Sequence, residues 1–311
     1  MVDQFKQSLN PARKKSTFSV SIPVEHPISI AVVATCFNRR QVTLAALRRL
    51  FAQQLPKNVE LTAFLLDAGS SDGTAEAVQS EFPQVRLLRG DPSLFWNAGM
   101  RVAYGEALQE NYDHYILLND DTHLYPDAIS SLLVTYHALL AQGEKYPIIT
   151  GSTQDPESHA LTYGGIERSS RFYPFRYRRI VPGEKPLPCH TINGNIVLIP
   201  REAANLTGNL SKAFTHSMGD HDYGLRARKV GCTLWVAPGY LGTCARNEIK
   251  GTWQDENLTF SERWRKLNGP KGMPPREYLS YTRLHGGPLW PLLWVYPYAR
   301  ALTLFALGRR A

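Results

Sequence analysis

The sequence predicts an α/β fold with three layers, α/β/α, a mostly parallel central sheet and a C-terminal helical extension. Two observations lead to this prediction. Short apolar runs rich in β-branched residues alternate with segments of helical periodicity over the first 118 residues, and such alternation is typical of βαβ units around a parallel sheet. Polar clusters also follow these runs, at the strand ends where α/β folds bind their ligands.

The expected elements follow one another in a regular order. Apolar runs predict strands at 28–34, 60–66, 85–88 and 114–118. The segments between them have the apolar spacing of amphipathic helices, which predicts helices at 39–53, 72–81 and 98–109. A chain of 311 residues is long enough to bury a full core within one domain of this kind.

Composition describes a globular protein with an excess of positive charge. The chain has 35 Lys and Arg against 27 Asp and Glu, a net charge of +8, which favours an anionic partner such as a nucleotide, a lipid phosphate or a membrane surface. The cysteines lack the spacing of a metal site, so we expect reduced thiols in a cytoplasmic protein. These cysteines are Cys36, Cys189, Cys232 and Cys244.

Both ends of the chain are expected to lie outside the main domain. Residues 1–27 are polar and lack the apolar core of a signal peptide, so we expect a loosely ordered arm. Residues 246–311 are expected to form an extension with a basic loop at 263–275 and an aromatic amphipathic tail. In the tail, 288–311, three prolines and Arg300 argue against a spanning helix. Packing on the protein body is favoured there, and peripheral contact with a membrane is the alternative.

Two polar clusters at expected strand ends suggest binding chemistry. In "LLNDDTH", Asp120 and Asp121 follow a buried strand, and adjacent carboxylates in a partly dry setting call for a cation such as a divalent metal ion. In "DAGSSDGT", Gly69 permits a tight turn and Asp67 can accept hydrogen bonds from a base or ribose. Turn and helix-cap chemistry is an equal alternative for the first cluster and the favoured explanation of the second. Walker-type phosphate loops and the GxGxxG fingerprint are absent, which disfavours an NTPase or a dinucleotide dehydrogenase.

Five stretches in order resemble the motifs of the inverting family 2 glycosyltransferases with a GT-A (Rossmann-like) fold, especially their rhamnosyltransferase-like bacterial branch. They are "VVATCFNRR", "LLDAGSSDGT", "FWNAGM", "LLNDDT" and "GDHDYGLRARKVG", and the resemblance runs from Ile28 to Val236. It implies a GT-A domain at 28–245, a nucleotide-sugar donor, a Mg²⁺ or Mn²⁺ ion and one aspartate acting as the base.

The resemblance also implies roles for individual residues. Asp121 is the expected direct metal ligand, with Asp120 beside it. For Trp96 and Asn97, core packing and helix capping are the alternatives to donor contact. The residues expected to bind the donor nucleotide are Thr35, Phe37, Asn38, Arg39, Asp67, Trp96, Asn97 and Asp120.

The expected base is Asp220. Members of the family usually have a Glu-Asp pair at this point, whereas this sequence has Gly219 before the aspartate. Helix capping is the alternative role for Asp220 and for Asp222. A third metal ligand in such enzymes is sometimes a late histidine, but Cys244 stands near the expected place, and water can fill the position. Histidines that remain candidates are His123, His190, His216, His221 and His285.

Two basic segments leave further alternatives open. The segment 168–179, "RSSRFYPFRYRR", interleaves arginines with aromatics. It is expected to be surface or a loop over the acceptor site, and single-stranded nucleic acid is the less favoured ligand. In the basic loop at 263–275, Lys271 or Arg265 can offset leaving-group charge if the loop closes over a diphosphate.

Taken together, the resemblance implies metal-dependent inverting transfer of a sugar from a dTDP- or UDP-linked donor to a hydroxyl of a glycan or lipid-linked glycan. Rhamnose is the favoured sugar, and cell-surface polysaccharide or O-antigen synthesis is the expected setting. The expected location is cytoplasmic, with peripheral association at the inner face of the cell membrane as an option. The alternative is a basic protein that binds nucleic acid or nucleotide sugars without catalysis, although no nucleic-acid partner is expected.

Overall fold

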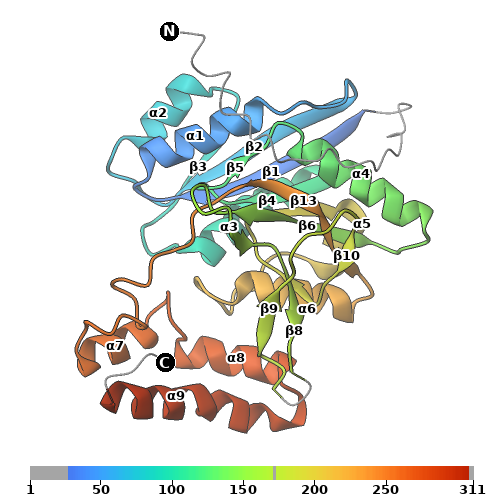
Figure 1. The fold of residues 1–311 in the computed structure, drawn as a ribbon. Coiled ribbons are helices and arrows are strands. Elements are labelled where there is room, and N and C mark those ends of the chain that lie inside the picture. Colours follow the sequence, from blue (N-terminus) through green and yellow to red (C-terminus); the bar gives the residue numbers. More distant parts are fainter. Residues whose placement is uncertain (1–26, 171–172, 308–311) are drawn as a thin grey trace.

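The computed structural model describes residues 27–170 and 173–307. The expected N-terminal arm therefore lies outside the described residues except for Pro27. Figure 1 shows a central sheet with helices on both of its faces and a separate layer of C-terminal helices below them. This arrangement confirms the three-layer α/β/α fold with a C-terminal helical extension.

One large, mixed sheet of ten strands forms the middle layer. Its main path runs in the order β10-β13-β6-β12-β4-β1-β2-β3, with β5 paired to β13 and β7 paired to β6. The strands are β1 (Ile28–Cys36), β2 (Val59–Asp67), β3 (Arg86–Arg89), β4 (His114–Leu118), β5 (His123–Leu124), β6 (Pro147–Gln154), β7 (Leu161–Tyr163), β10 (Leu187–Pro188), β12 (Ile196–Pro200) and β13 (Thr233–Thr243).

The parallel arrangement that the sequence predicts holds for the first half of this sheet. Strands β3, β2, β1 and β4 are all parallel to one another. Strand β12 is antiparallel to both β4 and β6, so the sheet as a whole is mixed rather than mostly parallel. The first residue of β12, Ile196, pairs with the last residue of β4, Leu118. The loop that leads into β12 therefore lies at the same edge of the sheet as the ends of the parallel strands.

Side chains of the central strands alternate between two hydrophobic clusters, as expected for a sheet covered on both faces. From β1, Ile30 and Val32 join the cluster under α1 (Arg40–Phe51), α2 (Thr74–Glu81) and α4 (Ala128–Ala141). Ala31 and Val33 join the opposite cluster. That cluster is covered by α3 (Trp96–Ala107), which leads into a short 3-10 turn, η2 (Leu108–Glu110), and by α5 (Arg201–Thr207) and α6 (Gly219–Lys229).

All elements expected up to residue 118 are present, with ends shifted by a few residues. The strand at 114–118 has the expected bounds, whereas the helix expected at 98–109 already begins at Trp96. Its earlier start matters because it places Trp96 and Asn97 in the first turn of α3, close to the strand ends.

The arginine-rich segment forms part of a small second sheet, in the order β11-β8-β9. These strands are β8 (Gly165–Arg168), β9 (Tyr177–Arg179) and β11 (Thr191–Ile192). Phe175 packs on the rings of Tyr278 and Tyr281, and the Tyr177 hydroxyl lies 3.0 Å from that of Tyr281. These two aromatic side chains are therefore used for packing, while Arg171 and Phe172 lie outside the described residues.

The C-terminal extension consists of α7 (Phe260–Leu267), α8 (Pro275–His285), a 3-10 turn η3 (Gly287–Leu289) and α9 (Trp290–Ala306). The structure differs here from the expected basic loop at 263–275, since its first part is the helix α7. A capping box between Thr259 and Glu262 starts this helix, and the Arg263 side chain is buried against the ring of Phe305. Among the described residues, no helix is both long and apolar enough to cross a bilayer.

Candidate active site

The candidate site lies at the edge of the sheet where the parallel strands end. Cys36 at the end of β1 pairs with Asp67 at the end of β2. On the other side of β1, β4 runs parallel to it and ends at Leu118, directly before the sequence Asn119-Asp120-Asp121. The three polar clusters identified in the sequence therefore meet in space, as the ligand-binding edge of an α/β fold requires.

The loops after β1 and β2 are held together by hydrogen bonds through Asn38. Its backbone N–H donates to Ser70 Oγ at 2.9 Å, and its side-chain oxygen accepts from the Ser71 N–H at 2.8 Å. Asn38 adopts a φ of 50° and Gly69 a φ of 76°. Both residue types tolerate this left-handed region. This side chain thus fixes the loop geometry at the edge.

Asp67 lies within the same loop pair and is completely buried. One carboxylate oxygen accepts hydrogen bonds from the backbone N–H and the hydroxyl of Ser70. The other oxygen makes no hydrogen bond within the described residues, and its closest cation is the Arg89 guanidinium at 3.6 Å. A buried acceptor of this kind suits a base or ribose donor, but the spot is closed to solvent in this structure.

Thr35 and Phe37 differ in how far they can meet a ligand. The Thr35 hydroxyl donates to the Leu66 carbonyl at 3.1 Å and packs against Gly99 of α3, so it is already used within the protein. Phe37 is 43% exposed, and its ring is available for stacking on a base. Both residues were expected to bind the donor nucleotide, and Phe37 is the one at the surface.

The adjacent carboxylates after β4 share one guanidinium. Arg39 Nη1 donates to Asp120 Oδ1 and Nη2 donates to Asp121 Oδ2, both at 2.9 Å. Such charge-assisted contacts offset the repulsion between two neighbouring carboxylates. Arg39 is itself 43% exposed, so its side chain can leave without disrupting the core. The cation expected beside the two carboxylates is therefore, in this structure, the exposed and displaceable guanidinium of Arg39.

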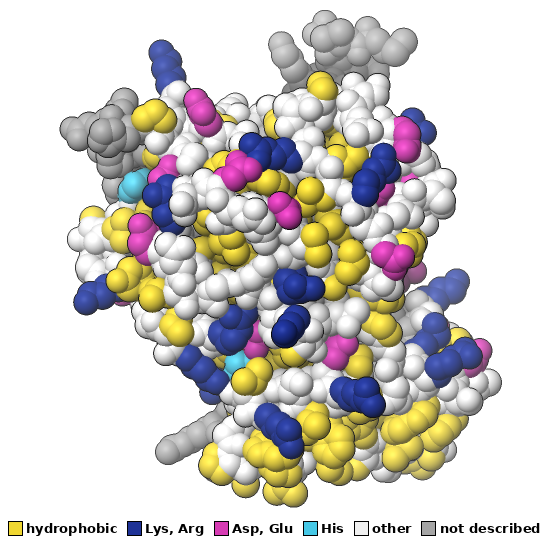
Figure 2. All heavy atoms as spheres, turned by 180° about the vertical axis from the view of Figure 1, so that it is seen from behind, with side chains coloured by type: hydrophobic (Ala, Val, Ile, Leu, Met, Phe, Trp, Pro, Cys, Tyr) yellow, Lys and Arg dark blue, Asp and Glu magenta, His cyan; other side chains and the backbone are white. Residues whose placement is uncertain are grey.

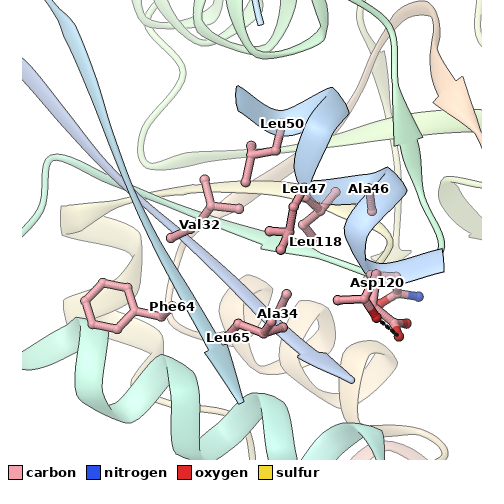
Figure 3. A pocket seen from close by; sticks show the side chains of 12 residues that line it. Val32, Ala34, Ala46, Leu47, Leu50, Phe64, Leu65, Leu118 and Asp120 are labelled. Carbon is pink, nitrogen blue, oxygen red and sulfur yellow. Dashed lines mark hydrogen bonds between the residues drawn. The ribbon is translucent and has the colours of Figure 1, made fainter. Parts of the chain in front are cut away.

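Asp120 is nearly buried above a small apolar cavity. Figure 3 shows its carboxylate at one edge of this cavity, apart from the aliphatic side chains that line the rest. The cavity measures about 20 Å³, enough for roughly one water molecule and far too small for a nucleotide. Burial raises the pKa of Asp120 to about 6, although Arg39 opposes this shift and Asp121 adds to it.

Asp121 is more exposed than Asp120 and meets Cys244 from the end of the large sheet. The Cys244 thiol lies 3.4 Å from Asp121 Oδ1, as a hydrogen-bond donor. Burial, together with the nearby Asp121 charge, raises the pKa of this thiol to about 12. In this structure the Cys244 thiol therefore acts as a hydrogen-bond donor that orients Asp121.

None of the five candidate histidines hydrogen-bonds to Asp120 or Asp121 in the described part of the chain. Across 27–170 and 173–307, no group of three or more His, Cys, Asp or Glu side chains is placed to hold a metal ion. Mg²⁺ commonly takes one or two carboxylates and completes its shell with phosphate oxygens and water, so the pair of carboxylates still fits such an ion. His123 is within electrostatic range of Asp121. The other four make their contacts with described residues away from the acidic pair, and they are His190, His216, His221 and His285.

Asp220 lies in the first turn of α6, after a strained residue. Met218 directly before this helix has a φ of 70°, which costs about 1–3 kcal/mol for a residue other than glycine. The Asp220 carboxylate accepts from the backbone N–H groups of His221 at 2.8 Å and Gly194 at 3.1 Å. These two N–H groups fix the orientation of the carboxylate at the start of α6.

Trp96 connects the acidic pair to Asp220. Its indole Nε1 donates to the side-chain oxygen of Asn119 at 2.7 Å, directly before Asp120. Its ring packs so closely on Gly194 that a Cβ there would lie 2.5 Å from the ring. Gly194 in turn donates its N–H to Asp220. Trp96 thus lies between the two groups of carboxylates, which come from opposite halves of the chain.

Asn97 is buried and holds the loop ahead of α6. Its amide nitrogen donates to the carbonyls of Ser211 at 2.9 Å and Phe214 at 2.6 Å. A side chain at position 219 would clash with Asn97, which explains the glycine in place of the family's usual glutamate. Donor contact was expected for Asn97, but its observed amide contacts position the segment that carries Asp220.

Asp222 is the other carboxylate in this motif, and its surroundings are quite different. It is completely buried and pairs with Arg226 Nε and with His285 Nε2, both at 2.8 Å. These contacts join α6 to α8. An acceptor hydroxyl cannot reach a carboxylate enclosed in this way, whereas Asp220 is partly exposed.

The basic turn after α7 lies close to the loop that leads to Asp220. Ser217 Oγ donates to the Pro270 carbonyl at 3.3 Å. Burial lowers the pKa of His216 to about 4, with Lys271 adding to this shift and Asp220 opposing it. Lys271 and Asp220 are therefore both within electrostatic range of the same imidazole.

The sequence analysis missed two residues of this site, Asn119 and Gly194. Gly194 belongs to the stretch "TINGN" at 191–195, a polar cluster between two apolar runs that is itself a sequence signal. Asn119 was quoted within "LLNDDTH" but had no role until the structure placed it against the Trp96 indole.

Comparison with solved structures identifies the class of fold. The mannosyltransferase PcManGT from Pyrobaculum calidifontis, in complex with GDP-Man and Mn²⁺, is similar with a TM-score of 0.51 and 15% identity over 92% of this chain and 74% of that one. S. aureus TarS 1-349, in complex with UDP-GlcNAc, is similar with a TM-score of 0.50 and 12% identity over 81% of this chain and 67% of that one. The fold is that of a GT-A glycosyltransferase.

The family is shown by the sequence itself. The model of glycosyl transferase family 2 matches residues 31–204, more than half of the chain, and the protein belongs to this family. The match extends from β1 to α5 and contains the acidic pair.

Two curated relatives point to a branch of the family. Both are N-acetylglucosaminyl-diphospho-decaprenol L-rhamnosyltransferases of Mycobacterium tuberculosis, from strains CDC 1551 / Oshkosh and ATCC 25618 / H37Rv. Each is 25% identical over 209 residues, which cover 59% of this chain and 66% of the relative, just under two thirds of its length. Within family 2, these rhamnosyltransferases are proteins that the chain resembles.

Proposed function

We propose that the protein is an inverting glycosyltransferase that moves a sugar, with L-rhamnose as the first candidate, from a dTDP- or UDP-linked donor to a hydroxyl of a lipid-linked or free glycan. The names of the two mycobacterial relatives support rhamnose and a lipid-diphosphate acceptor. The nucleotide sugars in the structural neighbours support a nucleoside-diphosphate donor. Cell-surface polysaccharide assembly is the setting that this reaction fits.

The placement of Trp96 is the single observation that carries the proposal. This residue contacts Asn119 beside the acidic pair on one side and Gly194 beside Asp220 on the other. A donor whose diphosphate lies at Asp120 and Asp121 would therefore have its sugar near the indole. The anomeric carbon would then face Asp220, which is partly exposed.

In this proposal, the loops after β1 and β2 bind the nucleoside. The exposed ring of Phe37 stacks on the base, and Asp67 offers a base or ribose donor the oxygen that accepts no hydrogen bond within the described residues. Asn38 keeps the two loops in register through Ser70 and Ser71. Thr35 supports these loops from within the protein, through the hydrogen bond from its hydroxyl to the Leu66 carbonyl.

Asp121, with Asp120 beside it, is proposed to hold a Mg²⁺ or Mn²⁺ ion. When bound, such an ion would offset the negative charge of the donor diphosphate as it leaves. Arg39 occupies the same two carboxylate oxygens in this structure, so its guanidinium has to turn away for the ion to enter. Lys271, which is within electrostatic range of His216, would supply a second positive charge.

Asp220 is proposed to be the general base. Its carboxylate takes the proton from the acceptor hydroxyl while the oxygen forms a bond to the anomeric carbon. The bond from that carbon to the diphosphate breaks on the opposite face, so the configuration inverts. The N–H groups of Gly194 and His221 hold the carboxylate in place, and such proton removal is worth roughly 10²- to 10⁴-fold in rate.

We also propose that the protein is located in the cytoplasm. All four cysteines are free and buried, as is usual in a reducing compartment. A lipid-linked acceptor would additionally require the enzyme to work at a membrane surface.

The proposal is tested by donor binding followed by transfer. Thermal unfolding is measured with UDP-, dTDP- and GDP-linked sugars, with and without Mn²⁺, because a ligand that binds only the native state raises Tm. We expect the largest rise with dTDP-rhamnose and Mn²⁺, and then transfer to a polyprenyl-diphosphate-linked N-acetylglucosamine analogue. NMR of the product should show an anomeric configuration opposite to that of the donor. Binding of no nucleotide sugar, or a product of retained configuration, would contradict the proposal.

A further inference from the structure

Helix α9 is apolar on two opposite faces, and only one of them packs against the protein. The inner face contributes Ala301 and Phe305 to a hydrophobic cluster with α7. The outer face carries exposed residues spaced three and four apart, so they form one stripe along the helix. Leu292 is 69% and Val295 is 51% exposed. The other members of this stripe are Tyr296, Ala299 and Leu302.

The rotation of α9 is fixed by specific contacts of its inner face. Trp294 Nε1 donates to the Pro275 carbonyl at 3.1 Å, and the Tyr298 hydroxyl donates to the Met273 carbonyl at 2.8 Å. Since these bonds hold the inner face against the start of α8, the helix cannot turn its outer stripe inward. The outer stripe is therefore a constant feature of the surface.

Exposed apolar residues continue beyond this stripe. Leu289 before α9, Leu284 at the end of α8 and Leu307 after α9 are also largely exposed. Figure 2 shows hydrophobic side chains gathered along the end of the molecule where Figure 1 draws α8 and α9. A contiguous apolar surface of this extent is uncommon on a monomeric protein and indicates an interaction site.

The charge of the chain segment that carries this surface is predominantly positive. Residues 263–311 contain nine Lys and Arg but a single acidic residue, Glu277. That carboxylate is already used, because it accepts hydrogen bonds from Thr215. In Figure 2, Lys and Arg side chains border the apolar region. Two copies of such a surface would repel each other, whereas an anionic partner would be attracted.

An open cavity of about 650 Å³ lies at the edge of the same stripe. Leu292 and Tyr296 of the stripe line it, together with Tyr173, whose ring contacts that of Tyr296. Two guanidiniums, those of Arg176 and Arg300, also reach this cavity. Apolar walls with two positive groups suit an amphiphile that has an anionic head.

We propose that the outer face of α9 is a docking surface for an anionic phospholipid bilayer. Leu292, Val295 and Tyr296 lie in the interfacial layer, and Arg176 and Arg300 contact lipid phosphates. The helix lies parallel to the membrane plane, as amphipathic interfacial helices do. Its aromatic residues suit the boundary between headgroups and acyl chains, and the basic residues suit the anionic headgroups. Docking needs neither donor nor acceptor, so it is independent of the proposed transferase reaction.

Sedimentation of the full chain with vesicles tests this proposal. Vesicles of phosphatidylcholine alone and with phosphatidylglycerol are compared at low and high salt. We expect binding to the anionic vesicles that weakens with salt. The double variant Leu292→Glu/Val295→Glu should bind roughly tenfold or more weakly, because two carboxylates would enter the interface. Arg176→Gln and Arg300→Gln should each weaken binding by roughly fivefold, the usual contribution of one basic residue at an anionic surface.

Matched controls come from the far side of the molecule, where Figure 1 draws α4. Leu140→Glu replaces a residue that is 41% exposed near the end of α4, and Lys145→Gln removes a nearby exposed charge. Both should bind vesicles as the unmodified chain does. Light scattering of each protein reports its oligomeric state, and Tm reports its folding.

The outcomes are distinct. Selective loss of vesicle binding in the folded α9 variants, with transfer to a water-soluble acceptor retained, supports docking. Equal binding of the α9 variants and the controls would overturn the proposal. A dimer that dissociates only in the Leu292→Glu/Val295→Glu variant, with vesicle binding unchanged, would also overturn it and assign the surface to a second copy of the chain.

Discussion

The two groups of carboxylates in the candidate site are held in opposite ways. Asp120 and Asp121, at the end of a parallel strand, are neutralised by the side chain of Arg39, which is exposed and can be displaced. Asp220, at the start of α6, is held by backbone N–H groups that cannot leave. The first arrangement suits exchange of one cation for another, and the second suits a base that must keep one orientation through every turnover.

The largest expected effect separates Asp220 from its neighbour Asp222. Asp220→Asn preserves size and the hydrogen bonds from Gly194 and His221 in part, but an amide is a very poor proton acceptor. We expect steady-state sugar transfer to fall by roughly 10²-fold or more with little change in Tm.

The matched variant, Asp222→Asn, should behave in the opposite way. It breaks a buried pair with Arg226 and His285, which costs about 3 kcal/mol of stability, while transfer per folded molecule is retained. Transfer rates and thermal unfolding of both variants are the measurements. If Asp222→Asn lost transfer while Asp220→Asn kept it, the assignment of the base would have to be reversed.

The next effect concerns the acidic pair. Asp121→Ala should remove the difference in nucleoside-diphosphate affinity between samples with and without Mn²⁺, because it deletes the more exposed of the two carboxylates. Calorimetry with the diphosphate measures both affinities. A metal-dependent difference as large as that of the unmodified protein would take Asp121 out of the metal site.

A smaller effect is expected for Arg39→Gln. Without the guanidinium, the two carboxylates repel each other, so the metal-free protein should lose on the order of 1 kcal/mol of stability, the upper range for an exposed ion pair. Mn²⁺ no longer competes with Arg39, and the rise in Tm on adding Mn²⁺ should become larger than in the unmodified protein. A smaller rise would mean that Arg39 assists the bound ion or diphosphate instead of competing for its place.

The smallest effect tests the link between the two halves. Trp96→Phe keeps a ring against Gly194 but loses the N–H that donates to Asn119, a hydrogen bond worth about 1 kcal/mol. Transfer should therefore fall by roughly fivefold. Trp235→Phe is the control, since its Nε1 bonds only to the nearby Thr233 hydroxyl. Equal transfer by the two variants would show that the Asn119 contact has no part in positioning the site.

Much of the fold could be predicted from local patterns in the sequence. The strand at 114–118 has the expected bounds because its apolar run stops abruptly at a polar cluster. The direction of β12 could not be predicted, since it depends on how the chain returns from the small sheet. Helix α7 was missed because the Gly and Pro residues after it dominated the pattern, although the sequence Thr259 to Glu262 carries a capping-box signal.

The site was predicted only as far as residue types and motif order allow. Asp120 and Asp121 were predicted from the polar cluster that follows an apolar run, and Asp220 from the resemblance to family 2. The contacts that define their chemistry join residues far apart in the chain, such as Arg39 to the acidic pair and Gly194 to Asp220. No local pattern encodes such pairings, so the internal cation and the role of Trp96 as a connector emerged only from the structure.

The most direct test of the central claim, that donor binding and proton removal belong to different halves of the chain, is single-turnover transfer at saturating donor. Saturation separates chemistry from binding. In Asp220→Asn, we expect donor affinity near that of the unmodified protein and a single-turnover rate lower by roughly 10²-fold or more. A normal single-turnover rate in this variant, or a loss of donor affinity that accounts for the whole defect, would contradict the claim.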